Sequence, residues 1–280
     1  MLKNIILSAM LLSAACGINA QDKQLVILHT NDTHSCIMPL NPNLADTTKA
    51  NRGGFVRRAT MINEERAKNP QLLLIDSGDF SQGSPYYTLF KGDVEIELMN
   101  EMKYDASTIG NHEFDFGLEN MARIFKRANF PILCSNYDFT GTVLDGIVKP
   151  YAIVKRNGIK IGIFAVDPKL DGLVFAKNCK GVKYLDPIGC AQKMADLLKA
   201  KGCDLVICVS HLGWKIGGDD DNKLIAKTRG IDLVLGGHSH SLLKDLVYEK
   251  NLDGKPIPVD QNGKNAIYVG KLTLDLNKRK

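Results

Sequence analysis

Short apolar runs rich in β-branched residues alternate along the chain with longer segments in which apolar residues recur every three or four positions. The short runs predict buried strands at residues 25–28, 72–75, 106–109, 132–135, 205–209 and 233–235. The longer segments predict helices at residues 55–67, 94–102, 118–128, 187–200 and 220–228. Such alternation of strands and helices indicates an α/β protein.

Two regions predict antiparallel pairing within this α/β pattern. Apolar runs at residues 152–154 and 159–166 flank Asn157-Gly158, a dipeptide that favours the tight turn of a β-hairpin. Closing strands are expected in the last part of the chain, around residue 257 and at residues 266–269 and 272–276. The sheets are therefore expected to be mixed, and no linker or repeat divides residues 21–280, which predict one domain.

The N-terminus has the pattern of a secretory signal peptide. Lys3 precedes an apolar run at residues 5–15, and Ala20 ends a small-residue pattern just before a polar segment. We expect cleavage after Ala20, so that residues 1–20 are removed and the protein is periplasmic or extracellular. Lipid attachment at Cys16 is the less favoured alternative, because a serine stands where lipoprotein signals usually carry a larger aliphatic residue. The apolar run is too short to span a membrane comfortably, and no other transmembrane segment is expected.

Composition and charge exclude several classes of protein. The 280 residues are 44% hydrophobic and 24% charged, which is ordinary for a globular chain. A net charge of +5 is mild, and the only tight basic run is Lys278-Arg279-Lys280, so nucleic acid binding is not expected. Six cysteines remain after Cys16 is removed, and none forms a CxxC pair, so neither a disulfide framework nor a cysteine metal site is predicted.

Polar clusters follow five of the predicted strands. The clusters are Asn31-Asp32-Thr33-His34, Ser77-Gly78-Asp79, Gly110-Asn111-His112-Glu113, Ser210-His211 and Gly236-Gly237-His238-Ser239-His240. Ligands of open α/β sheets gather at the carboxyl ends of the strands. Five of the six histidines lie in these clusters, so the sequence predicts one convergent site rather than scattered surface histidines.

The residue types in these clusters suit divalent metal ions. Imidazole nitrogens together with carboxylate and amide oxygens are typical ligands of Mn, Fe, Zn, Co or Ni. Two such ions about 3.5–4 Å apart form a clamp for a phosphoryl group and its attacking oxygen. A shared carboxylate must then bridge the ions, and Asp79, the middle aspartate of the set, is the natural bridge.

The clusters resemble the five sequence blocks of the calcineurin-like metallophosphoesterases: Asp-x-His, Gly-Asp, Gly-Asn-His, a lone His and Gly-His-x-His. Further motifs narrow the resemblance to the catalytic domain of the 5′-nucleotidases. They are Leu28-His29-Thr30-Asn31-Asp32, Gly53-Gly54 before a helix, Asp76-Ser77-Gly78-Asp79 followed by Gly83-Ser84, Tyr104-Asp105-Ala106, and Gly110-Asn111-His112-Glu113-Phe114-Asp115-Phe116-Gly117. The similarity runs from about residue 25 to about residue 276. It implies a four-layer α-β-β-α sandwich of two mixed sheets.

The resemblance also implies a role for each matching residue. One metal ion would be held by Asp32, His34, Asp79 and His240, and the second by Asp79, Asn111, His211 and His238. His112 and Asp115 match the catalytic dyad, in which a protonated His112 stabilises the transition state while a metal-activated hydroxide attacks phosphorus. A loop or helix-capping role is the alternative for Asp115.

The 5′-nucleotidases carry a second domain that stacks the base and grips the substrate, and we expect that domain to be absent from this chain. The motifs therefore indicate the reaction more specifically than the substrate. The expected substrate is a small phosphoester, which the resemblance suggests is a nucleotide. The first hypothesis is a free-standing 5′-nucleotidase-like phosphomonoesterase. The alternatives are one half of a split enzyme with a separate substrate-binding protein, a phosphodiesterase of the 2′,3′-cyclic nucleotide type, and a related sulfur-ester hydrolase.

Several other residues are expected to have structural rather than catalytic roles. His29 is expected to be a buried, hydrogen-bonded imidazole, and Glu113 a loop group or a support behind the ligands. Trp214 is expected to pack rather than to shape the cleft, and Tyr86 and Tyr87 to pack at a helix start. Three arginines are expected by default to lie on a solvated helix face: Arg52, Arg57 and Arg58.

Overall fold

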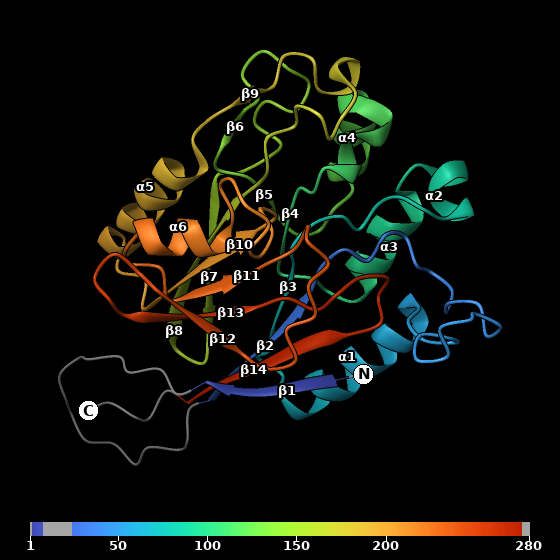
Figure 1. Ribbon diagram of the computed structural model, residues 1–280, viewed down its shortest axis with the longest axis horizontal. Helices are drawn as coiled ribbons and strands as arrows, with labels where there is room; N and C mark the ends of the chain where they lie inside the picture. Colours follow the sequence, from blue (N-terminus) through green and yellow to red (C-terminus); the bar gives the residue numbers. More distant parts are fainter. Residues whose placement is uncertain (1, 8–23, 276–280) are drawn as a thin grey trace.

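The computed structural model describes residues 2–7 and 24–275, and two six-stranded sheets form its centre (Figure 1). The first sheet has the strand order β1-β14-β2-β3-β4-β5. Its strands are β1 (Leu2–Leu7), β2 (Gln24–Thr30), β3 (Leu73–Asp76), β4 (Ala106–Thr108), β5 (Ile132–Leu133) and β14 (Val269–Asp275). Strands β2 to β5 are parallel to one another, whereas β14 is antiparallel to β2.

The second sheet has the order β12-β13-β11-β10-β8-β7 and is also mixed. Its strands are β7 (Tyr151–Arg156), β8 (Ile159–Val166), β10 (Leu205–Ser210), β11 (Leu233–Leu235), β12 (Val247–Lys250) and β13 (Pro256–Asp260). The predicted hairpin is confirmed, because β7 and β8 pair antiparallel around Asn157 and Gly158, which both have positive φ. A small separate sheet pairs β6 (Tyr137–Asp138) with β9 (Lys183–Tyr184).

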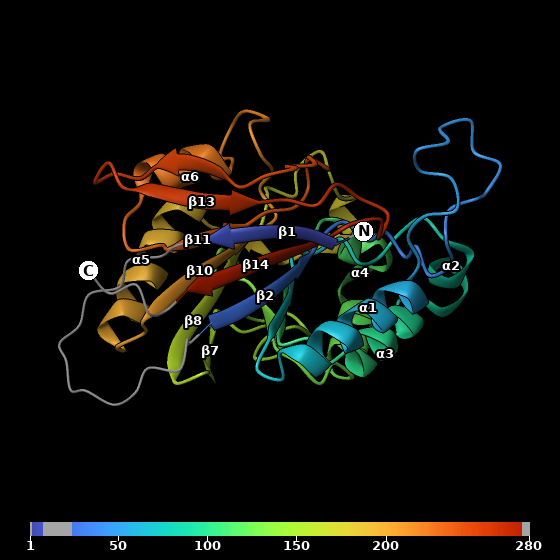
Figure 2. The ribbon, with the colours of Figure 1, turned by 90° about the horizontal axis from the view of Figure 1, so that it is seen from below.

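Helices cover the outer face of each sheet, which confirms the expected four layers (Figures 1 and 2). The first sheet is covered by α1 (Phe55–Lys68), α3 (Asp93–Glu101) and α4 (Gly117–Phe125), and the second by α5 (Pro187–Ala200) and α6 (Asp221–Lys227). Three short helical segments lie in connecting loops: α2 (Pro85–Phe90), η1 (His112–Phe116) and η2 (Ala176–Cys179).

Alternation along the strands builds three apolar cores. In β2, Leu25 and Ile27 enter the core between the sheets, while Val26 and Leu28 enter the core beneath the helices. The core between the sheets joins residues from β2 and β3 to residues from β8, β10 and β11. The two sheets are therefore fixed face to face by side chains from both.

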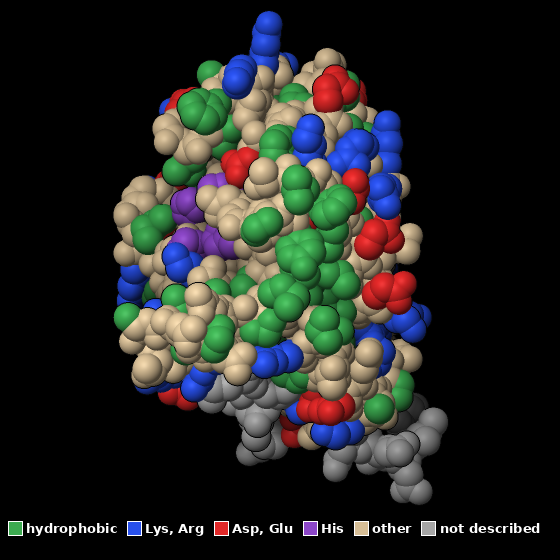
Figure 3. All heavy atoms as spheres, turned by 90° about the vertical axis from the view of Figure 1, so that its right-hand side faces the viewer, with side chains coloured by type: hydrophobic (Ala, Val, Ile, Leu, Met, Phe, Trp, Pro, Cys, Tyr) green, Lys and Arg blue, Asp and Glu red, His purple; other side chains and the backbone are tan. Residues whose placement is uncertain are grey.

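The carboxyl ends of β2, β3 and β4 in the first sheet and of β10 and β11 in the second lead into the five polar clusters. In Figure 3 histidine side chains gather in a hollow of one face, next to a band of hydrophobic side chains. The fold thus places loops from both sheets at a single edge of the sandwich.

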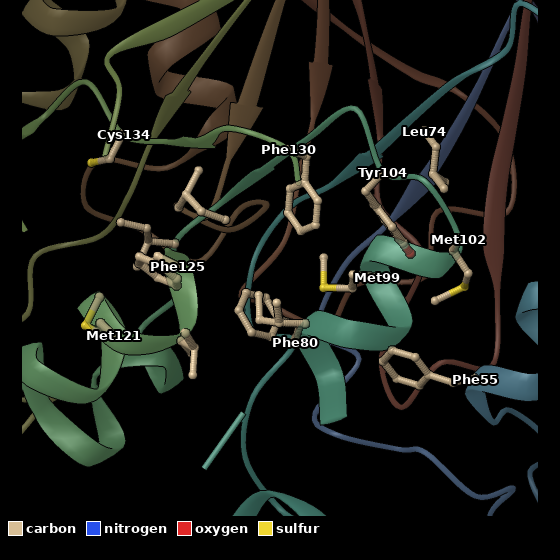
Figure 4. Packing of buried hydrophobic residues seen from close by; sticks show 14 of the residues in the cluster. Phe55, Leu74, Phe80, Met99, Met102, Tyr104, Met121, Phe125, Phe130 and Cys134 are labelled. Atoms are coloured by element: carbon tan, nitrogen blue, oxygen red, sulfur yellow. The ribbon is translucent and has the colours of Figure 1, made fainter. Parts of the chain in front are cut away.

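The core under α1, α3 and α4 is rich in aromatic and methionine side chains, and Figure 4 shows Phe55, Phe80, Met99 and Tyr104 converging there. These side chains are almost completely buried. Aromatic rings and flexible thioethers fill irregular space between a sheet and three helices efficiently. The core supports the loop after β3, because Phe80 directly follows Asp79 in that loop.

Most predicted elements are confirmed within one to three residues, but the closing strands differ. Residues 266–268 were expected to be strand and instead lie in a loop, because Ala266 has a φ of 57° and β14 begins only at Val269. Of α2 the sequence indicated only a helix start at Tyr86 and Tyr87, and it did not indicate β12; both elements are short and only partly buried.

The N-terminal residues 2–7 form β1, which pairs parallel with β14 at the edge of the first sheet. The predicted cleavage after Ala20 falls outside the described residues and stays a prediction. No helix within residues 2–7 and 24–275 is both long and apolar enough to cross a bilayer. The six cysteines of this part of the chain are free thiols.

We predict that Ile207→Ala in β10 lowers the free energy of unfolding by about 2–5 kcal/mol, because Ile207 is fully buried between the sheets and its truncation leaves a cavity. Val56→Ala, at a position 69% exposed on α1, is the control and should change stability by about 0.5 kcal/mol or less. Urea denaturation of the metal-free protein measures both. Equal effects of the two substitutions would contradict the assignment of this core.

Candidate functional site

The structure brings the seven predicted metal ligands together from both sheets. Three groups of residues each have donor atoms within 4.8 Å of one another. The groups are Asp32 with His34 and His240, His34 with Asp79 and His112, and Asp79 with His211 and His238. The seventh residue, Asn111, follows β4 and is buried, and its Oδ1 has no hydrogen-bond partner. Asp79 lies near His34 from the first sheet and near His211 and His238 from the second, as expected of a shared carboxylate.

The loops that carry these side chains are bonded to one another through their backbones. Asp32 donates its N–H to Gly78 O at 2.9 Å, and His34 donates to Asp79 O at 2.9 Å, so the loops after β2 and β3 run side by side. The N–H of His238 donates to the Asp32 carboxylate at 3.0 Å, which joins the second sheet to the first. The ligand positions are therefore set by main-chain contacts as well as by packing.

Five of the seven predicted ligands have a left-handed backbone conformation, which is uncommon for residues with a side chain. They are Asp32, His34, Asp79, His238 and His240, with φ between 44° and 69°. A residue held in this region costs on the order of 1–3 kcal/mol and persists only where its surroundings enforce it. Such strain is concentrated at functional sites in proteins, and here it coincides with the ligand set.

Two glycines, Gly110 and Gly237, allow the loops that carry the predicted ligands to lie in close contact. A Cβ at Gly110 would lie 2.0 Å from Asp79 Oδ1, and a Cβ at Gly237 would lie 2.8 Å from His211 Nδ1. Either contact is far shorter than van der Waals distance, so any side chain there would displace a predicted ligand.

His211 is oriented by the turn that presents Asp79. Its Nδ1 donates to Ser77 O at 2.6 Å, which leaves Nε2 facing Asp79 Oδ2 at 3.2 Å. Burial opposes a charge on either side chain, but the charge of Asp79 raises the pKa of His211 well above its usual value. His211 in turn lowers the pKa of Asp79 below its ordinary range despite complete burial. His211 therefore holds a proton next to the Asp79 carboxylate, and a metal ion bound in its place would release that proton to solvent.

Asp32 Oδ1 lies 3.9 Å from His34 Nε2 and 3.5 Å from His240 Nε2, and these two nitrogens are 2.9 Å apart. Complete burial raises the pKa of Asp32 to about 8, with the charge of Asp79 adding to the rise against the opposing charge of His211. Burial lowers the pKa of His34 to about 4. Burial and then the positive charge of Lys264 lower the pKa of His240. Near neutral pH the two imidazoles are therefore uncharged, as metal ligands must be.

His112 opens the short helix η1 with Asp115 one turn later. Its Nδ1 lies 3.2 Å from Asp115 Oδ2, which leaves Nε2 for the groove, and 26% of its side chain is exposed. Burial lowers the pKa of His112, but the hydrogen bond to Asp115 and the charge of Asp79 outweigh burial and raise it. The main-chain N–H of His112 also donates to Asp79 Oδ1 at 2.9 Å, so the imidazole is fixed beside the ligand set.

Glu113 holds two of the site loops together from below. Its fully buried carboxylate accepts hydrogen bonds from the N–H groups of Asp79 at 3.0 Å, Ser81 at 3.0 Å and Gly110 at 2.6 Å. Burial and the nearby charge of Asp79 raise the pKa of Glu113 to about 7. The sequence indicated only a supporting or loop group here, and the structure shows that the support is a clamp between the loops after β3 and β4.

The other residues weighed from the sequence lie outside the ligand set. His29 is fully buried and its Nε2 is 2.9 Å from Ser77 Oγ, which confirms the packed imidazole. Trp214 packs against the core of the second sheet, and Tyr87 is buried and packs against Phe116, again as expected. The interpretation of Arg58 as part of a solvated face is wrong, because it is 4% exposed, lies over the Phe55 ring and reaches toward the core.

A groove of about 830 Å³ opens at the site. His34, His112 and His240 form one part of its wall, and the loop at residues 35–41 and the start of α2 form another. Tyr86 lines the groove as well, while its neighbour Tyr87 is buried. The histidines in the hollow of Figure 3 belong to this face.

The chemistry of the donor atoms also fits divalent metal ions. Asn111 Oδ1 is a buried acceptor atom without a hydrogen-bond partner among the described residues. Buried polar atoms are nearly always paired, so an unpaired amide oxygen in the loop that also carries His112 indicates an additional ligand. Nitrogen and oxygen donors from aspartate, asparagine and histidine suit borderline divalent metals.

Comparisons with known proteins agree with this geometry. Residues 25–242 match the model of the calcineurin-like phosphoesterase family. A snake venom 5′-nucleotidase from Crotalus adamanteus is 34% identical over 96% of this chain and 48% of its own length. A human 5′-nucleotidase is 32% identical over 91% of this chain and 47% of its own length.

A solved structure gives the same result in three dimensions. The crystal structure of a 5′-nucleotidase precursor from Thermus thermophilus superposes with a TM-score of 0.82 and 32% identity, covering 90% of this chain and 51% of that one. The chain spans about half the length of the curated relatives it matches.

We predict that Glu113→Gln lowers the free energy of unfolding by about 2–3 kcal/mol at pH 8, where Glu113 is ionised. The amide replaces one acceptor oxygen by a donor, so that at least one of the three buried N–H groups is left unsatisfied. Glu64→Gln, at an exposed position of α1, makes the same chemical change and should have little effect. Chemical denaturation of the metal-free proteins compares them, and an equal, small effect would show that Glu113 is no clamp.

Proposed function

The chain belongs to the calcineurin-like phosphoesterase family, and we propose that it hydrolyses phosphomonoesters with two divalent metal ions, as a 5′-nucleotidase-like enzyme. The observation that carries the proposal is the position of Asp79, whose carboxylate lies within 4.8 Å of a donor atom of His34 and of donor atoms of His211 and His238. Two ions joined by one carboxylate form a clamp suited to a phosphoryl group.

Each ion would be held by side chains from both sheets. We assign Asp32, His34, Asp79 and His240 to one ion, and Asp79, Asn111, His211 and His238 to the other. Bound divalent ions act as Lewis acids on phosphoryl oxygens and make water a stronger acid near neutral pH. The protein residues orient the ligands, since Ser77 fixes the ring of His211 and Gly110 allows the approach of Asp79.

His112 is assigned to the reaction rather than to a metal ion. Its Nδ1 hydrogen bond to Asp115 fixes the tautomer and favours the charged imidazole, and its other nitrogen is free to meet a substrate oxygen. A cation at this point stabilises the negative charge that develops on the phosphoryl group, and it can supply a proton to the leaving oxygen.

A second candidate is the catalytic half of a split nucleotidase whose substrate is bound by a separate protein. Large apolar side chains are exposed along and near the groove, among them Met38, Leu89 and Phe90, and Figure 3 shows a hydrophobic band beside the histidines. Contiguous apolar surface of this kind marks interaction sites. We also propose export, because of the N-terminal pattern of charge and apolar residues.

One assay separates the two candidates. The purified chain, loaded with manganese, is given AMP and an aryl phosphate in parallel. Turnover of both esters supports an independent nucleotidase, and turnover of the aryl ester alone supports a missing substrate-binding partner. Inactivity on both would contradict a self-contained phosphoesterase.

We predict that Asp79→Asn reduces bound metal from two ions per chain to one or fewer after dialysis. An amide oxygen is neutral and cannot replace a carboxylate between two cations. Asp46→Asn, in an exposed loop, is the control and should retain both ions. Elemental analysis gives the stoichiometry, and two ions per chain in Asp79→Asn would refute the bridge.

We predict that His112→Ala keeps the metal content and lowers kcat on the order of 10²–10⁴-fold, as for loss of a positioned acid or cation. Asp115→Asn should lower kcat less, because the imidazole stays but its charged form loses support. Glu119→Ala, on the neighbouring helix, is the control. If His112→Ala loses metal together with activity, His112 is a ligand and the assignment fails.

A further inference from the structure

The loop between β13 and β14 has an unusual backbone. Gly263, Asn265 and Ala266 all have positive φ, at 67°, 60° and 57°. Glycine adopts this conformation freely and asparagine fairly often, but alanine rarely does. The loop therefore keeps its shape only because its surroundings enforce it.

The contacts that enforce this shape come from the metal-ligand loops. Asn31 donates its Nδ2 to Gly263 O at 2.8 Å, and Asn265 donates its N–H to Asp32 O at 2.9 Å. The N–H of Gly263 donates to Ser241 O at 2.9 Å, one residue past His240. The loop is thus fastened on both sides to residues that carry or adjoin metal ligands.

Lys264 lies in the middle of this fastened segment. Its side chain is exposed and lines the groove together with His34, His112 and His240, and it is the only lysine or arginine among the residues that line the groove. None of the ion pairs or hydrogen bonds within residues 2–7 and 24–275 involves its ammonium group. Figure 3 shows a basic side chain beside the histidines on this face.

An unpaired ammonium group on a rigid, strained loop at a metal site has no structural task within the described chain. Lys264 differs from other exposed lysines by its place in the wall of the groove, beside three histidines of the site. Lysine binds phosphate as a compact point charge on a flexible stem. The ligand that fits is an anion that enters the groove.

We propose that Lys264 binds the phosphate group of the substrate and thereby favours dianionic phosphomonoesters over monoanionic diesters. The inference rests on the proposed function. It adds a specificity-determining residue in a part of the chain that carries none of the metal-ligand motifs.

The kinetic consequence follows from charge. A phosphomonoester carries close to two negative charges at pH 8, because its second pKa is about 6, whereas a diester carries one. An ammonium contact made in both the bound substrate and the transition state changes KM more than kcat. Because Lys264 is exposed, its contribution falls as the ionic strength rises.

Three variants test this role. Lys264→Met removes the charge and keeps much of the side-chain volume, and Lys264→Arg keeps the charge. Lys193→Met, on the exposed side of α5, makes the same change in net charge away from the groove. Each is assayed at pH 8 with manganese on 4-nitrophenyl phosphate and on bis(4-nitrophenyl) phosphate, at low and at high salt. Calorimetry of inorganic phosphate binding to the metal-loaded proteins gives a readout that does not depend on turnover.

We expect Lys264→Met to raise KM for the monoester on the order of tenfold at low salt, with kcat and metal content unchanged and at most about a twofold effect on the diester. Phosphate binding should weaken by a similar factor, and Lys264→Arg should restore most of both. No change in KM, or an equal loss on both esters, overturns the proposal even if the wild-type protein is active. A wild-type protein inactive on both esters contradicts the proposed function itself, and this inference with it.

Discussion

The burial of several carboxyl and imidazole groups in one place is the constraint on which the rest of the structure depends. Asp32, Asp79, Glu113 and His211 are all 0–1% exposed. Removing charges from water costs several kcal/mol for each ion unless partners compensate. Within the chain the compensation is partial: Asp79 and His211 share one proton between them, and Asp32 keeps its own up to about pH 8. Divalent cations would complete it.

This site exists only because the two sheets pack face to face. The first sheet supplies Asp32, Asp79 and Asn111 through its loops, and the second supplies the three histidines that follow β10 and β11. The core between the sheets fixes their separation, and the hydrogen bond from His238 to Asp32 fixes the register of the loops. The packing of the sheets therefore sets the positions of the predicted ligands. The left-handed backbone of five of these ligands is a strain that the packing must outweigh.

The sequence predicted the features that local patterns encode. Strand alternation and helix spacing placed α1, α5, β8 and β11 closely, and the clusters after five strands predicted one convergent site. Patterns of polarity did not predict the loop at residues 266–268, because the residues just before it, Gly263 and Asn265, are held by hydrogen bonds with residues over two hundred positions away. The burial of Arg58 and the groove position of Lys264 were missed for the same reason, since both depend on how distant segments pack. The clamp formed by Glu113 needs three main-chain donors from two loops, which no spacing in the sequence reveals.

The central claim is that this chain by itself assembles a two-ion centre for phosphoester hydrolysis. The most direct measurement is a titration of the chelator-treated protein with Mn²⁺, with the hydrolysis rate of 4-nitrophenyl phosphate recorded against ions added per chain. The account predicts no activity without metal and a rise that levels off at two equivalents. A plateau at one equivalent, or activity that survives removal of the metal, would contradict it.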